Sequence, residues 1–297
     1  MTKRKKSKRS PNALYYLIAV VCAFCLSYEP IADILPEQVK EVFASKTETA
    51  LPADAEMRQP AGAEKKPAAG RLEIPARLKD TPELLLQRRG YTVSYNRDLK
   101  IPNWVAWELT PEKLVERESR TDKFLPDPDL PEAEAVTTDD YKGSGMDRGH
   151  MCPAGDNRWH WKAMQESFYM TNICPQDHNL NRGDWKELEE ACRRWAQKEG
   201  RIYIVCGPVL YKQKHRTIGK QHKVTVPEGF FKVVLCADSR PPKAIGFIYK
   251  NQSENRPMEY YARTVDEVES VTGIDFFPAL PDKTERKVEA EYDLKNW

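Results

Sequence analysis

The sequence lacks internal repeats, which excludes a repeat architecture, and its N-terminal apolar run is short for a membrane-spanning helix. That run covers residues 13–26, whereas a spanning helix needs roughly 20 apolar residues. Six basic residues and no acidic residue precede it, and this order is typical of an export signal. We expect residues 1–27 to be a signal peptide or an uncleaved signal anchor. The protein would then be exported (periplasmic or secreted) or attached to a membrane through residues 13–27.

The body of the chain also lacks an excess of basic residues. The chain has 47 lysines and arginines against 45 acidic residues. Without the six basic residues of the leader, 41 basic residues remain and the net charge becomes −4. Binding of nucleic acid through an overall positive field is therefore excluded. Any phosphate binding must depend on a local basic cluster or on a metal ion.

No zinc-finger or zinc-ribbon spacing is present, although Cys174 and His178 are four residues apart. No second ligand pair follows them at such a spacing, so structural zinc is a minor alternative. Cys152 and Cys174 each lie two residues after a candidate site residue. The sequence leaves open whether these two thiols form a disulfide or stay free.

Composition divides the remaining chain into a linker and a folded domain. Residues 28–83 are rich in Ala, Pro, Glu and Lys without apolar periodicity, which predicts a low-complexity linker. Residues 84–297 are the predicted domain. Strands are expected at 91–95, 104–109, 202–205, 230–236 and 244–249, and helices at 157–167 and 181–198. Because strands and helices are mixed without regular βαβ alternation, the predicted class is α+β, with a mainly antiparallel sheet flanked by helices.

The second predicted helix carries one apolar face. Trp185, Leu188, Cys192 and Trp195 recur at a spacing of three or four residues, which places them on one side of a helix. Asp184 with Glu187 resembles a capping box, and Asn179 or Asn181 is the alternative cap.

Two segments combine residue types suited to phosphodiester hydrolysis, GSGMDRGHMCPAGDN at 143–157 and FYMTNICPQDHNLNRGDWKELE at 168–189. A neutral imidazole can accept a proton from the attacking water. Arginines can hold phosphate oxygens, and a hard divalent cation held by an amide oxygen can neutralise developing charge. Arg148 and His150 share one face if their segment is a strand. Gly149 between them permits close approach of a phosphate or an unusual dihedral angle.

These segments resemble the DNA/RNA non-specific endonuclease family, which includes endonuclease G and has a ββα-metal core. The family's DRGH motif matches residues 147–150, and its TNxxPQ and LNxxxWxxLE blocks match residues 171–176 and 180–189. The resemblance extends from about residue 91 to about residue 278. It implies an enzyme, a metal-dependent endonuclease that hydrolyses DNA and RNA, and family members often form homodimers.

The resemblance also implies a role for each site residue. His150 would be the general base, and Asn181 the only direct protein ligand of one Mg²⁺ ion, with Mn²⁺ as a possible substitute. Glu189 would hold a metal-bound water, and Asp147 would be structural or would support the metal ligand. Asn172 would orient His150 or the phosphate. Arg148 and an upstream arginine would bind phosphate, and Arg120 matches that arginine better than the alternative Arg117.

Three other functions remain open at this stage. The same histidine and metal could act on small phosphodiesters. The chain could also be a catalytically inactive binding module or a zinc-dependent scaffold.

Overall fold

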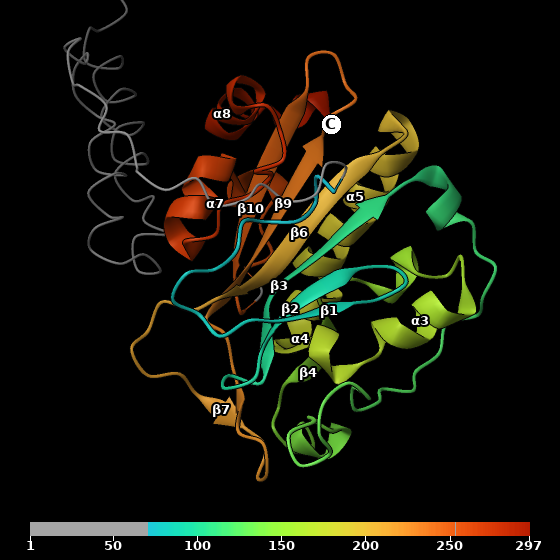
Figure 1. Cartoon of the computed structure of the whole chain (residues 1–297), viewed down its shortest axis with the longest axis vertical. Coiled ribbons are helices and arrows are strands. Elements are labelled where there is room, and N and C mark those ends of the chain that lie inside the picture. The colour runs from blue at the N-terminus through green and yellow to red at the C-terminus, as the bar shows by residue number, and fades with distance from the viewer. Residues whose placement is uncertain (1–70, 253) are drawn as a thin grey trace, which may run out of the picture. The chain divides into compact units, whose positions relative to one another are not determined.

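A seven-stranded antiparallel sheet forms the centre of the computed structural model, which describes residues 71–252 and 254–297 (Figure 1). The strand order is β1-β2-β3-β6-β9-β10-β11. The strands are β1 Leu84–Gln87, β2 Thr92–Asn96, β3 Ile101–Leu109, β6 Ile202–Val209, β9 Gly229–Cys236, β10 Lys243–Lys250 and β11 Ala262–Arg263. The five predicted strands correspond to β2, β3, β6, β9 and β10. The predicted α+β class with an antiparallel sheet is therefore confirmed.

Two short hairpins and six helices complete the described part of the chain. The hairpins pair β4 Asp147–His150 with β5 Ile173–Gln176, and β7 Thr217–Ile218 with β8 Val224–Thr225. The helices are α3 Trp161–Ser167, α4 His178–Arg182, α5 Asp184–Glu199, α6 Met258–Tyr261, α7 Val265–Thr272 and α8 Asp282–Ala290. The β4–β5 hairpin followed by α4 and α5 supplies the ββα element of the fold.

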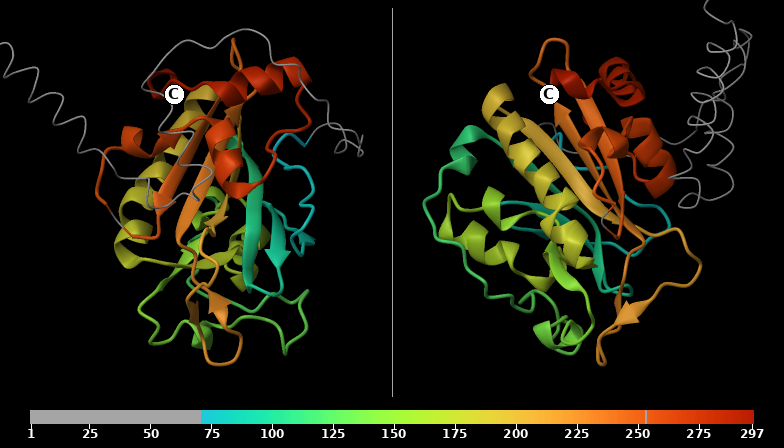
Figure 2. Two further views of the ribbon diagram at one scale, coloured as in Figure 1. Left: turned by 90° about the vertical axis from the view of Figure 1, so that its left-hand side faces the viewer. Right: turned by 180° about the vertical axis from the view of Figure 1, so that it is seen from behind.

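Helix α5 covers one face of the sheet, as the view from behind shows (Figure 2). Its predicted apolar positions, Trp185, Leu188, Cys192 and Trp195, are all buried in the same core cluster as Ile204 and Phe247 of the sheet. Helices α7 and α8 lie over the opposite face, where Val268 and Val288 join a second cluster. Alternating side chains of the central strands thus serve two cores, because neighbouring residues of a strand point to opposite faces.

Residues 71–83 run as an extended segment before β1. Leu72, Ile74 and Leu78 pack against the core beneath α7 and α8, so the described structure begins upstream of residue 84. The division into leader, linker and a domain starting at residue 84 stays a prediction. The leader and residues 28–70 of the linker lie outside the described residues. No helix among residues 71–252 and 254–297 is long and apolar enough to cross a membrane.

The helix starts differ from the predicted ones. Helix α3 begins at Trp161, later than predicted, and the His160 side chain caps it. Residues 178–182 form the separate helix α4, which Asp177 caps through two backbone amides. Helix α5 has Gly183 as its N-cap, and the predicted capping box is absent because the Asp184 carboxylate accepts a hydrogen bond from Tyr261 instead.

The cysteines of the described residues are free thiols, and all five are buried. The Cys152 Sγ accepts a hydrogen bond from Asn157, and the Cys206 thiol donates one to the Met151 carbonyl. The alternative of a disulfide between Cys152 and Cys174 is therefore not realised here. Zinc at Cys174 and His178 is not supported either, since the His178 ring bonds to Asp147.

Candidate active site

A cavity of about 880 Å³ at the β4–β5 hairpin and the start of α5 gathers most of the predicted site. Five of the six candidate residues line it, namely Arg120, Arg148, His150, Asn181 and Glu189. They come from a loop, a strand and two helices, and they are up to 69 positions apart in the sequence. The fold thus brings a histidine, two arginines, an amide and a carboxylate to one solvent-filled space.

The β4–β5 hairpin positions Arg148 and His150 on the cavity side. Residues 147–150 form a strand, which is the condition under which the side chains of Arg148 and His150 share one face. Gly149 faces the other way, and an added Cβ there would lie 2.1 Å from the Gln176 Oε1. The glycine is therefore required by the buried Gln176 side chain opposite it. Its φ is not positive, so an unusual dihedral angle is not the reason, and close approach of a phosphate stays a prediction.

Aromatic rings hold the His150 imidazole in place. The ring centroid of Phe168 lies 4.7 Å from that of His150 in an edge-on arrangement, and that of Phe124 lies 5.3 Å away. Burial, followed by the positive charges of Arg120 and Arg148, lowers the pKa of His150 to about 3. The imidazole is therefore neutral at physiological pH, and its Nε2 has no hydrogen bond to the described protein.

Asp147 orients the Asn181 side chain at the cavity wall. The Asn181 Nδ2 donates to the Asp147 Oδ2 at 2.9 Å, so the amide oxygen is directed away from this carboxylate. Asp147 also contacts the ring of His178 and the guanidinium of Arg182. An amide oxygen beside a cavity is a suitable ligand for a hard cation such as Mg²⁺, and the site residues fit such an ion.

Glu189 lies in the second turn of α5 and faces the same cavity. Burial raises the pKa of this carboxyl to about 7, while Lys232 and Arg193 act in the opposite direction. Lys232 is wholly buried beneath the cavity, with its Nζ 4.3 Å from the centroid of the Trp185 ring. Lys232 and Arg193 thus oppose the effect of burial on Glu189 more than the other cations do.

Asn172 is the candidate residue that does not line the cavity. It is completely buried, and its side chain accepts from the Cys152 amide at 2.9 Å and donates to the carbonyls of Cys152 and Ser167 at 2.8 Å. The side chain thus fixes the backbone two residues after His150. This arrangement fits the positioning alternative and leaves no contact with a phosphate in the cavity.

Arg120 lines the cavity, whereas Arg117 does not. The Arg120 guanidinium carbon lies 5.8 Å from the centroid of the Phe168 ring. The structure also adds basic residues that the sequence analysis missed, namely Lys142, Arg182, Lys186 and Arg193. Arg193 lies four residues after Glu189, so helical spacing alone could have placed it on the same face.

A second cavity of about 460 Å³ adjoins the first and shares Arg120 and Arg193 with it. Arg158 and Arg194 line this second cavity. The two cavities form a continuous basic groove, which is defined here as the residues of both. It is the local basic cluster that a chain with a negatively charged body needs for phosphate binding.

The family model of DNA/RNA non-specific endonucleases matches residues 74–283. The chain belongs to this family. It is 34% identical over 210 residues to Nuclease 1, mitochondrial, of Schizosaccharomyces pombe, which covers 65% of each chain. It is 36% identical over 217 residues to Nuclease EXOG, mitochondrial, of Danio rerio, covering 67% of this chain and 63% of that protein. The chain therefore spans slightly less than two thirds of these relatives' length.

Other similar proteins share more of their length with this chain. A nuclease of Nostoc sp. is 35% identical over 229 residues, which is 72% of this chain and 81% of that protein. A chain in the crystal structure of the EndoG/EndoGI complex superposes with a TM-score of 0.63 and 28% identity. It covers 68% of this chain and 90% of its own length, which confirms that the family's fold is present.

The comparisons overturn one prediction. The prediction of export or membrane anchoring is wrong, because the similar family members of S. pombe, Danio rerio and Homo sapiens are named as mitochondrial nucleases. The basic leader and its apolar run, on which the prediction rested, lie outside the described residues.

Proposed function

We propose that this protein is a metal-dependent endonuclease that hydrolyses phosphodiester bonds of DNA and RNA without sequence preference. The observation that carries the proposal is one cavity lined by a neutral histidine, an amide oxygen held outward by Asp147, and two arginines. The names of the relatives, which are nucleases, support the same activity. The proposal accounts for a basic groove on a chain whose body has no basic excess.

His150 would act as the general base in this reaction. Its neutral ring can accept the proton of a water that attacks phosphorus. In the free protein, burial and then the two guanidinium groups hold the pKa of His150 low. A phosphodiester bound between Arg120 and Arg148 would offset their charge and so raise the basicity of the imidazole when it is needed. Asn172 would keep the strand that carries His150 in register.

Asn181 would be the direct protein ligand of a single Mg²⁺ ion, and Glu189 would hold a water of its hydration shell. When bound, the ion supplies positive charge that stabilises the transition state and the departing 3′ oxygen. Mn²⁺ would substitute because it accepts the same oxygen donors. Asp147 would keep the Asn181 oxygen turned toward the ion by accepting from the amide nitrogen.

Arg148 and Arg120 would bind the oxygens of the scissile phosphate. Their forked donors match phosphate geometry, and ring contacts restrict both side chains, with Arg148 4.3 Å from the Phe124 centroid. Contacts to phosphate alone carry no base information, which agrees with cleavage without sequence preference.

Pairing into a homodimer is a further proposal, and sedimentation of the purified protein would test it.

The decisive experiment is digestion of plasmid DNA and of RNA by the wild type and by His150→Ala. We expect Mg²⁺-dependent cleavage of both substrates and a loss of at least about 100-fold in turnover in the variant, with nucleic-acid binding retained. Chelation by EDTA should abolish activity, and Mg²⁺ or Mn²⁺ should restore it. Equal loss of binding and turnover in His150→Ala would contradict the assigned role.

Two alternatives are separated by the same preparation. Hydrolysis of bis-p-nitrophenyl phosphate without plasmid nicking would indicate a small-molecule phosphodiesterase. Absence of any metal-dependent hydrolysis, with binding intact, would indicate a binding module.

A further inference from the structure

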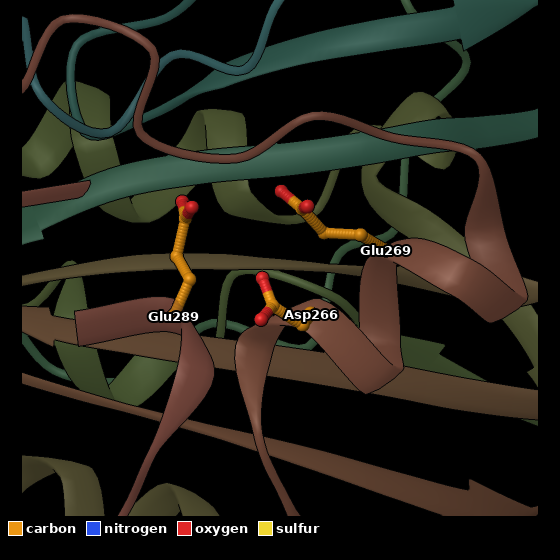
Figure 3. Close-up of side chains that lie close together, drawn as sticks. All are labelled: Asp266, Glu269 and Glu289. Carbon is orange, nitrogen blue, oxygen red and sulfur yellow. The ribbon is translucent and has the colours of Figure 1, made fainter. Parts of the chain in front are cut away.

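Three acidic side chains converge on the sheet face opposite α5. Asp266 and Glu269 extend from α7 and Glu289 from α8, and one carboxylate oxygen of each lies within 4.8 Å of the others (Figure 3). None of the three lines the catalytic cavity or the adjoining one. The cluster is therefore separate from the site assigned to hydrolysis.

Glu289 makes this cluster more than a group of surface charges. Its side chain is directed toward the other two carboxylates (Figure 3), and the residue is only 6% exposed. Its Oε1 is buried and has no hydrogen-bond partner in the described protein. A buried acceptor without a partner is unfavourable, and more so when it is charged, so this oxygen is available to bind a cation.

The protein supplies no cation to this cluster. No ion pair joins Asp266, Glu269 or Glu289 to a basic side chain within residues 71–252 and 254–297. Among the described residues, the three carboxylates accept one hydrogen bond, which the Phe276 amide donates to the Glu269 Oε1 at 2.7 Å. Burial, together with repulsion between the carboxylates, raises the pKa of Glu269 to about 7 and that of Glu289 to about 9.

We propose that Asp266, Glu269 and Glu289 bind one divalent cation of the Ca²⁺ class, distinct from the ion at Asn181. Hard cations take oxygen ligands, and two oxygens on one Ca²⁺ at roughly 2.3–2.6 Å can lie up to about 5 Å apart. One oxygen from each of the three side chains lies within 4.8 Å of the others, which is close to the separation that a shared ion needs. Mg²⁺ requires shorter distances and near-octahedral geometry. Asp266 is exposed, which leaves room for water in the remaining coordination positions.

The expected consequence is structural. The ion would join the first turns of α7 to the last turn of α8, and both helices pack on the second core through Val268 and Val288. Binding to the folded state alone stabilises it by mass action. This inference does not depend on the proposed nuclease activity.

The test is calcium binding by the purified full chain in an Asn181→Ala background, which removes the catalytic ligand. We compare this variant with Asn181→Ala/Glu289→Gln and with the matched control Asn181→Ala/Glu291→Gln. Glu291 is an exposed acid just after α8, so both double variants replace one carboxyl group with an amide. Calorimetric titration with CaCl2 gives the stoichiometry, and thermal unfolding with and without CaCl2 gives the stabilisation.

We expect Asn181→Ala and the Glu291 control to bind one Ca²⁺ per chain and to gain at least about 3 °C in Tm at saturation. The Glu289→Gln protein should lose both effects. In EDTA it should melt no lower than its parent, because a neutral amide adds no repulsion to the cluster. Asp266→Asn, at an exposed position, is a second variant that should also lose calcium binding if Glu289→Gln fails to fold.

Two results would overturn the proposal. One is the absence of calcium binding in Asn181→Ala, in which case the carboxylates share protons instead. The other is equal binding and equal stabilisation in the Glu289 and Glu291 variants, which would place the ion elsewhere. In either case the hydrolytic activity of the wild type is unaffected, so the nuclease proposal is tested separately.

Discussion

At the residue scale, the chemistry depends on how neighbours set the state of single side chains. His150 is neutral because it is buried against Phe168 and faces two guanidinium groups. Asn181 presents its oxygen because Asp147 accepts from its nitrogen. In both cases a residue outside the reaction itself prepares the group that carries it out, which is how preorganised sites work.

The low pKa of His150 predicts that its ring does not titrate between pH 5 and pH 8 in the free protein. The folded ring stays neutral down to about pH 3, whereas an unfolded histidine binds a proton near pH 6.5. Stability therefore falls as the pH drops from about 6.5 toward 3. NMR titration of the histidine Cε1 protons checks this, with His150→Ala identifying the signal.

Arg120→Gln should shift that titration upward, because it removes one positive charge near the ring. Lys283→Gln, on the distant helix α8, is the matched control and should leave it unchanged. A His150 signal that titrates near pH 6.5 in the wild type would contradict the assigned environment.

The contact between Asp147 and Asn181 predicts that Asp147→Ala weakens Mg²⁺ binding. Loss of a supporting hydrogen bond to a metal ligand costs about 10–100-fold in metal affinity or activity. The measurement is the Mg²⁺ concentration for half-maximal nicking of plasmid DNA. Asp139→Ala is the control, because Asp139 also lines the cavity but its side chain has no hydrogen bond within the described protein. This variant should leave the Mg²⁺ concentration unchanged. An unaltered Mg²⁺ requirement in Asp147→Ala would remove Asp147 from this role.

At the scale of elements, the β4–β5 hairpin presents His150 and Arg148 because the opposite side of β4 is filled by Gln176. Gly149→Ala would push a methyl group into that side chain, since the added Cβ lies 2.1 Å from the Gln176 Oε1. We expect a loss of about 1–3 kcal/mol in the free energy of unfolding, measured by urea denaturation.

The double variant Gly149→Ala/Gln176→Ala should recover much of that loss. The Gln176 side-chain amide has no hydrogen-bond partner in the described protein, so removal of this side chain breaks no hydrogen bond there. A favourable coupling of about 1 kcal/mol is expected from a double-mutant cycle. Strict additivity of the two single variants would show that the glycine serves another purpose, such as close approach of substrate.

The elements differ in how far the sequence could predict them. The apolar face of α5 and the strands β2, β3, β6, β9 and β10 follow from periodicity, because burial imposes it directly. The split between α4 and α5 at Gly183 does not follow from periodicity, which does not show that a Cβ at this position would lie 2.6 Å from the Asn179 carbonyl oxygen. The edge strand β1 and the helices α7 and α8 carry weaker patterns and were not predicted.

The site divides in the same way. The DRGH, TNxxPQ and LNxxxWxxLE segments identified Arg148, His150, Asn172, Asn181 and Glu189 by resemblance, and the spacing placed Arg148 on the same face as His150 if their segment is a strand. The inward position of Asn172, buried against Cys152 and Ser167, could not be predicted because it depends on tertiary contacts. Lys232 was hidden within a run of buried strand residues, where a charged side chain is rare.

At the scale of the whole molecule, a chain with a negatively charged body must concentrate its cations where phosphate binds. The basic groove does so across two adjoining cavities, with Arg120 and Arg193 shared between them. Arg193 is also held by the buried Asp156, at 3.1 Å from its Nη1. The groove extends beyond the histidine, so a nucleic acid longer than one phosphodiester can contact it at several phosphates.

This layout predicts that Arg194 contributes to the binding of long substrates and not to the chemical step. The first cavity, which His150 lines, is the inner cavity of the groove, and the second is the outer cavity. Arg194 lines only the outer cavity. Binding of duplex DNA weakens with salt because each phosphate contact releases counterions, with a log–log slope of about −0.9 per contact. Arg194→Gln should therefore reduce the magnitude of that slope by about 0.9, while kcat on a dinucleotide that fills only the inner cavity stays unchanged.

Arg286→Gln, which removes an exposed charge on α8, is the control for the loss of the same charge outside the groove. The two arginines differ in that only Arg194 lies in the groove. If both variants lower the slope equally, the overall charge of the protein governs binding, and the outer cavity has no separate role.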